Sequence, residues 1–136
     1  MSLVIDASLT LSWYFDDEST EIGDTVMEQV ARDGAVVPIL WRYEVANAFL
    51  KAIRRKRVDA AYRDASLAEL RLLPIIVDTS GEEVTWTTTL GISDRFGLSI
   101  YDAAYVELAH RRAMALATGD RAMSRAAQAL SISVIS

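Results

Sequence analysis

Four acidic side chains carry the most chemical information in this sequence: Asp6, Glu44, Asp102 and Asp120. Each stands at or near a point where an apolar run changes into a helical pattern. Singly, each is accounted for as a helix cap or as a first-turn acid that suits the helix dipole. If the fold gathers them at one sheet edge, two carboxylates ~4 Å apart repel by ~4 kcal/mol at an effective dielectric near 20. Such a group takes up protons or binds cations.

The scarcity of cysteine and histidine limits the kind of metal site and the mechanism that the four acids can form. The sequence has no cysteine and one histidine, His110, which excludes thiolate metal sites and a two-histidine nuclease mechanism. We expect His110 on a helix surface, followed by an ordinary helix terminus at Arg111 and Arg112. Oxygen ligands alone favour Mg²⁺ or Mn²⁺ over zinc. One or two such ions suit an in-line phosphoryl displacement, so the acids predict a metal-dependent phosphodiesterase.

Three polar residues near the acids are candidates for supporting them. Asn47 follows Glu44 by three residues, which places both on one helix face. Ser8 and Thr118 each stand two residues from an acid. Their hydroxyls can orient a carboxylate or act only as local caps and turn formers. Both interpretations remain open at this stage.

The elements that must position these residues alternate along the chain in the order β, α, β, αα, β, αα, β, α, β. Short apolar strands between helices indicate an α/β fold with a parallel sheet covered on both faces. The strands are predicted at 3–5, 35–37, 74–77, 115–118 and 132–135. The helices are predicted at 9–15, 21–32, 41–55, 59–71, 81–91, 99–112 and 121–130, with a turn at 94–97. Capping-box spacing starts the fifth helix at Ser80 with Glu83 and the sixth at Ser99 with Asp102.

Length and charge limit the classes of protein that remain. The 136 residues fit one domain, 1–136, and the formal net charge of −5 argues against a protein that coats nucleic acid nonspecifically. Neither a signal-peptide pattern nor an apolar run of ~18–20 residues is visible, so we expect a cytoplasmic protein without a membrane partner. One basic run is either an RNA track or a solvated helix end: Arg54, Arg55, Lys56 and Arg57.

Four segments together resemble a known family. They are Val4-Ile5-Asp6-Ala7-Ser8, Tyr43-Glu44-Val45-Ala46-Asn47-Ala48-Phe49-Leu50, Leu98-Ser99-Ile100-Tyr101-Asp102-Ala103-Ala104-Tyr105-Val106 and Leu116-Ala117-Thr118-Gly119-Asp120. In this order and spacing they cover nearly the whole chain. The sequence resembles a PIN domain and, within that family, a VapC-type ribonuclease toxin of a toxin–antitoxin pair.

The resemblance implies both a fold and an activity. The fold would be a three-layer α/β/α arrangement around a parallel sheet of about five strands. The activity would be endonucleolytic hydrolysis of RNA, with one or two Mg²⁺ or Mn²⁺ ions bound by the four acids. Ser8, Asn47 and Thr118 match positions that support the acidic site. The family also implies a homodimer and a cognate antitoxin whose C-terminal segment blocks the site.

The chain departs from the family pattern at one place. Many relatives carry a further acid a few residues after the fourth aspartate, whereas Met123 and Ser124 stand there in this chain. The occupancy of a second metal site is therefore open.

Three alternatives share some of these features. A receiver-type signalling module has a similar length and strand pattern, with Asp78 as phosphoacceptor, but the first strand is followed by a single acid and no lysine follows Lys56. A haloacid-dehalogenase-like phosphatase requires D-x-D after the first strand, and Ser8 occupies the third position. A PIN domain that only binds a partner is disfavoured by the intact acids.

Overall fold

The computed structural model describes residues 1–136 and contains one sheet of five parallel strands. The spatial order is β3-β2-β1-β4-β5. The strands are β1 (Leu3–Ile5), β2 (Ala35–Pro38), β3 (Ile75–Asp78), β4 (Leu116–Ala117) and β5 (Val134–Ile135). Every pairing between neighbours is parallel, with Val4 opposite both Val36 and Leu116. The predicted α/β class with a parallel five-stranded sheet is confirmed.

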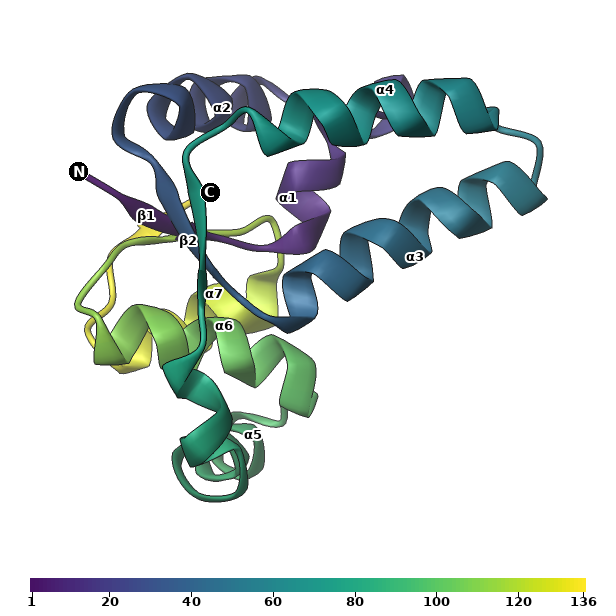
Figure 1. The fold of residues 1–136 in the computed structure, drawn as a ribbon. Coiled ribbons are helices and arrows are strands. Elements are labelled where there is room, and N and C mark those ends of the chain that lie inside the picture. Colours follow the sequence, from purple (N-terminus) through teal and green to yellow (C-terminus); the bar gives the residue numbers. More distant parts are fainter.

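Helices cover both faces of this sheet (Figure 1). Figure 1 shows α1, α2 and α4 on one side and α6 and α7 on the other, while α3 and α4 form a projecting hairpin whose two helices meet at its outer end. The α-helices are α1 (Ala7–Leu11), α2 (Glu21–Asp33), α3 (Leu40–Arg54), α4 (Ala60–Arg71), α5 (Leu90–Phe96), α6 (Ile100–Arg111) and α7 (Arg121–Ala129). There are also two 3₁₀ turns, η1 (Asp16–Glu18) and η2 (Ser80–Val84), and one π-helical turn, η3 (Thr85–Thr89). None of the helices has both the length and the apolar composition needed to cross a membrane.

The hydrophobic core lies around the central strand. Leu3, Val4 and Ile5 of β1 are fully buried, because β1 has a strand on each side and a helix on each face. Helix α6 crosses the sheet beside β1, β2 and β4 and contributes Tyr105 and Val106 to the core. A strand buried on both faces reads as an uninterrupted apolar run, which is why β1 was visible in the sequence.

Gly34 ends α2 and starts β2 in a conformation that other residues rarely adopt. Its φ of 84° is left-handed, and a Cβ at this position would lie 2.9 Å from the carbonyl oxygen of Pro74. The Gly34 N–H donates to the carbonyl of Val30 and closes the last turn of the helix. Glycine therefore permits an abrupt change from helix to strand.

The segment between β3 and α6 differs most from the prediction. The expected helix 81–91 and turn 94–97 are wrong: a 3₁₀ turn, η2, is followed by a π-helical turn, η3, and then by α5, which runs through to Phe96. Ser80 does not cap this segment, since the Gly81 N–H donates to Asp78 instead. The β-branched threonines of η3 lose side-chain freedom in an α-helix, which favours a wider turn there.

The first helix also differs from the prediction. The sequence predicted 9–15, but α1 begins at Ala7 because the carboxylate of Asp6 accepts the Leu9 N–H at 2.8 Å. It ends at Leu11, and the chain continues through turns that bury Tyr14 and Phe15. An N-cap directly after the strand therefore moves the helix start towards β1.

Candidate active site

The candidate acids lie at the edge of the sheet where the parallel strands end. Asp6 follows β1 directly, and Asp120 follows β4 after two residues. From β1 the chain adds β2 and β3 on one side of β1 and then crosses to add β4 and β5 on its other side. The strand order therefore reverses between β1 and β4. Ligands of open α/β sheets bind in the crevice at such a reversal. Asp6 and Asp120 flank this crevice.

The other two acids reach the same edge from helices. Glu44 lies in the first half of α3, which begins two residues after β2. Asp102 lies in the first turn of α6, and α6 precedes β4, so it starts at the edge where the strands end. The Ser99 hydroxyl accepts the Asp102 N–H at 3.1 Å, as the capping spacing predicted.

Thr118 links the two acids on the strands. Its hydroxyl donates to Asp6 Oδ2 at 2.5 Å and accepts the Asp120 N–H at 3.0 Å. The second oxygen of Asp6 caps α1, and Asp120 Oδ1 caps α7 by accepting the Met123 N–H at 2.8 Å. The cap interpretation is therefore confirmed for both aspartates. It does not exclude a further role, because each carboxylate has additional lone pairs.

Tyr105 is the residue of this edge that the sequence reasoning passed over. Its hydroxyl donates to Glu44 Oε1 at 2.7 Å and joins α6 to α3. Burial and the neighbouring Glu44 carboxylate raise the pKa of Tyr105, so the hydroxyl stays protonated and remains a donor. Its position three residues after Asp102, on the same helix face, was the available signal.

The electrostatics of the edge are those of an acidic group without a cation. Burial raises the pKa values of Asp6, Glu44 and Asp102, and the neighbouring carboxylates raise them further. The carboxylates of Asp6 and Asp102 raise the pKa of Glu44, and the carboxylate of Asp120 raises the pKa values of Asp6 and Asp102. Asp6 and Asp102 thus interact with both Glu44 and Asp120, and we call these four acids the acidic row.

No lysine or arginine neutralises this row, since none of the salt bridges includes any of these four acids. No three of the carboxylates converge closely enough to hold an ion as they stand. Unscreened carboxylates repel one another, and a bound divalent ion removes that repulsion. Carboxylate oxygens without histidine or cysteine fit Mg²⁺ or Mn²⁺.

The two remaining support candidates are not attached to the acids. Ser8 is exposed in α1, and Asn47 is exposed one turn after Glu44 in α3. Neither side chain takes part in the hydrogen bonds of the structure, in contrast to Thr118. Both are free to contact a ligand at this edge.

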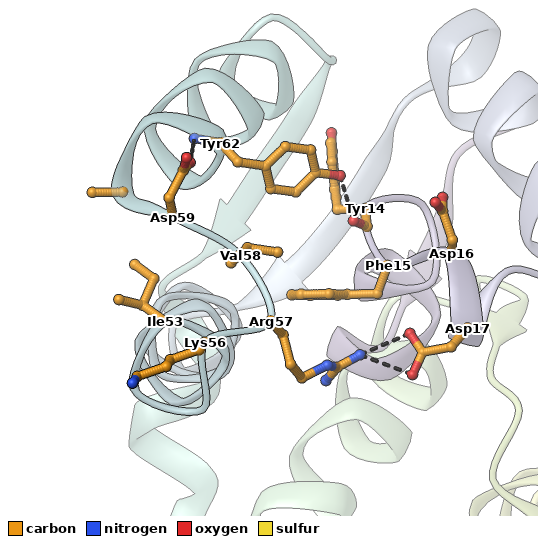
Figure 2. A pocket seen from close by; sticks show the side chains of 11 residues that line it. Tyr14, Phe15, Asp16, Asp17, Ile53, Lys56, Arg57, Val58, Asp59 and Tyr62 are labelled. Atoms are coloured by element: carbon orange, nitrogen blue, oxygen red, sulfur yellow. Dashed lines mark hydrogen bonds and ion pairs between the residues drawn. The ribbon is translucent and has the colours of Figure 1, made fainter.

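The basic run lies at the tip of the α3–α4 hairpin. Arg57 donates two hydrogen bonds to Asp17, at 2.7 and 2.9 Å, and its guanidinium lies 5.0 Å from the centre of the Phe15 ring (Figure 2). The groove drawn in Figure 2 includes Lys56 and Arg57 but none of the four candidate acids. Arg57 thus joins the hairpin to η1, while Arg54, Arg55 and Lys56 remain exposed.

A second charged group, also absent from the prediction, joins the end of β3 to the end of α6. Arg111 donates to Asp78 at 2.7 and 3.2 Å and to Glu107 at 2.8 and 3.2 Å. The side chains of Asp78 and Glu107 are only 5% and 4% exposed. Arg111 does end α6, but it is a partner in a buried ion pair rather than an ordinary terminus. Asp78, proposed as the phosphoacceptor of a receiver module, is occupied by this arginine.

Comparisons with known proteins agree with this architecture. A family model described as PIN domain matches residues 3–129. The chain is 28% identical over 130 residues to Ribonuclease VapC3 of Pyrobaculum aerophilum, which covers 96% of this chain and 98% of that protein.

Two solved structures have the same fold. The crystal structure of PAE2754 from Pyrobaculum aerophilum superposes with a TM-score of 0.66 at 25% identity, covering 99% of this chain and 92% of the other. The crystal structure of FitAcB from Neisseria gonorrhoeae gives a TM-score of 0.65 at 12% identity, covering 100% and 97%. At that lower identity the likeness concerns the fold alone.

Proposed function

The chain belongs to the PIN-domain family, and from this premise we propose that it is a metal-dependent endoribonuclease acting as the toxin of a toxin–antitoxin pair. The observation that carries the proposal is the row of four acids at the strand-order reversal: none of the four is paired with a protein cation, and the pKa values of Asp6, Glu44 and Asp102 are raised. The relative named as a ribonuclease supports RNA as the substrate. Membership of this family sets aside the receiver and haloacid-dehalogenase alternatives.

The residues of this chain have separate tasks in the proposed reaction. Asp6, Glu44, Asp102 and Asp120 hold one or two Mg²⁺ or Mn²⁺ ions. When bound, these ions neutralise the charge of the phosphodiester and lower the pKa of water. Thr118 orients Asp6 through the 2.5 Å hydrogen bond, and Tyr105 orients Glu44.

Ser8 and Asn47 complete the proposed site from its rim, where they are exposed and unpaired. Met123 is buried after Asp120, so no further acid extends the row at this end. We infer that these acids would hold one ion firmly and a second ion more weakly. RNA reaches the site past the exposed cations Arg54, Arg55 and Lys56.

The proposed partners follow from the same family. A cognate antitoxin occupies the site when the nuclease is inhibited, and two copies of the chain form a homodimer. With RNA as substrate, we expect the protein to act in the cytoplasm.

The decisive experiment compares matched acid substitutions on purified, antitoxin-free protein. Structured RNA is incubated with Mg²⁺, with Mn²⁺ and with EDTA, and fragments are resolved by electrophoresis. We expect cleavage only with metal, and its loss in Asp6→Asn. Asp94→Asn is the control, because it removes the same charge from an exposed position of α5. Undiminished metal-dependent cleavage by Asp6→Asn would rule out Asp6 as a ligand, and the absence of any cleavage by the wild-type protein would contradict the nuclease proposal.

A further inference from the structure

A second cleft opens beside the acidic row. It has a volume of about 270 Å³ and is lined by Tyr43 of α3 and Tyr101 of α6, with Pro38 and Leu40 from the end of β2 and the start of α3. Tyr43 directly precedes Glu44, and Tyr101 directly precedes Asp102. Successive helical side chains point about 100° apart, so each helix presents an acid to the crevice and a tyrosine to this neighbouring cleft. We call it the tyrosine cleft.

The two rings are exposed, although most of the surface that lines the cleft is apolar. Tyr43 is 74% and Tyr101 61% exposed, and neither hydroxyl takes part in a hydrogen bond of the structure. Tyrosines that neither pack in a core nor hydrogen-bond are candidates for contacts with a ligand. Both rings line the same cleft, so a flat group bound there has an aromatic side chain from α3 and one from α6 in its wall.

The charged side chains that line the cleft disfavour an anionic occupant. They are Glu82, which is in no salt bridge, and Asp78, Glu107 and Arg111, which are already paired with one another. A phosphate would meet three carboxylates and a guanidinium that two of them neutralise. A neutral ring with donors and acceptors on its edge would meet partners of both kinds in the Glu82 carboxylate and the Thr85 hydroxyl, which also line the cleft.

We propose that the tyrosine cleft binds an unpaired nucleobase of the RNA, next to the phosphodiester that is cut. The inference rests on the proposed ribonuclease function and adds substrate selection to it. A base inside an A-form duplex is stacked and paired, so it cannot lie between protein rings without leaving the helix. The cleft therefore selects loops, bulges and single-stranded ends.

Binding of RNA without turnover tests this directly. A fluorescein-labelled, unstructured oligoribonucleotide is titrated in EDTA and followed by anisotropy, beside the same sequence in a complete duplex. We expect the single strand to bind more tightly, and Tyr43→Ala and Tyr101→Ala each to weaken its binding about tenfold, within the range for stacking of one base on an aromatic ring. Tyr43→Phe and Tyr101→Phe keep the ring and should bind as the wild type does.

Trp86→Ala is the matched control, since Trp86 is an exposed aromatic of η3 that does not line the cleft. An oligoribonucleotide with one abasic position gives an independent readout. At the stacked position the missing base should cost the same factor as the alanine variants, and combining the two should cost no more.

The outcomes separate the cleft from the nuclease. If both alanine variants cleave RNA with metal and their RNA affinity and KM are unchanged, the proposal that the cleft binds a base is wrong and the ribonuclease proposal stands. If RNA binding depends on the tyrosines but the wild type does not cleave RNA, the base-binding proposal stands and the nuclease proposal is refuted. If the alanine variants instead convert a dimer to a monomer in sedimentation velocity and bind RNA normally, a second copy of the chain covers the tyrosines and the inference fails.

Discussion

Replacing Arg111 with methionine tests whether the ion pair with Asp78 and Glu107 stabilises the fold. The substitution removes four hydrogen bonds, leaves the nearly buried Glu107 carboxylate without a cation, and leaves Asp78 with only Arg112 at 3.8 Å. Breaking a buried pair in this way costs about 3–5 kcal/mol. Since the Arg111 side chain is itself 29% exposed, water can reach the carboxylates, and we expect about 3 kcal/mol at pH 7.

The loss of stability in Arg111→Met should depend on pH. The Arg111 guanidinium, with the Gly81 N–H, holds the pKa of Asp78 below the ordinary value of 3.8. The resulting stability is present above that value and is lost as the pH falls through the lowered pKa. In Arg111→Met this contribution is absent, so the difference from the wild type should be fully present at neutral pH and should shrink only as the pH falls below 3.8.

Urea denaturation followed by circular dichroism measures both effects. Arg112→Met is the matched control, because Arg112 approaches Asp78 only at 3.8 Å and its side chain is 40% exposed. An exposed pair of this kind is worth about 0–1 kcal/mol. A loss below about 1 kcal/mol in Arg111→Met, or a loss that stays the same from neutral pH to well below the ordinary Asp78 pKa of 3.8, would refute the reasoning.

Two further predictions concern the acidic row, and a third concerns the contact between the α3–α4 hairpin and η1. Tyr105→Phe removes a hydrogen bond that lowers the pKa of Glu44, so the acid limb of the pH–rate profile should move to higher pH, with a loss of about 1 kcal/mol in stability; an unmoved limb would contradict the contact. The pKa values of Asp6, Glu44 and Asp102 are raised in the folded protein, so their contribution to stability is complete below the ordinary values of 3.8 and 4.5 and is lost as the pH rises through the raised values. Thermal melts of the metal-free protein should show this loss, and Mg²⁺ should stabilise the protein more at pH 8 than at pH 5. Arg57→Gln should cost no more than about 1 kcal/mol in chemical denaturation, because its partners are exposed, and a larger loss would mean that the contact with η1 holds the hairpin.

Much of the fold was readable from local pattern. Buried strands appear as short apolar runs, and the cap at Ser99 was visible in its spacing with Asp102. Prediction failed between Ser80 and Gly97. There a capping-box spacing competed with Asp78, which already accepts the Gly81 N–H, and Gly97 at a φ of 68° ends α5 where a turn was expected.

The candidate site divides in the same way. That Asp6 and Asp120 share an edge follows from parallel strands, and Thr118 was correctly associated with them. Tyr105 was missed as a partner of Glu44, although it lies one turn from Asp102. A hydrogen bond across 61 residues is not encoded in any local pattern.

The sequence by itself determined which side chains are available for chemistry and in what order the strands and helices carry them. Apolar runs and caps act over a few residues, so they are legible in the chain before it folds. Only the tertiary structure decided that Arg111 pairs with Asp78 across 33 residues, and that two tyrosines next to the acids line a common cleft. Those contacts depend on how α3, α6 and β3 pack against one another, and packing of distant segments follows from the whole core rather than from any local spacing.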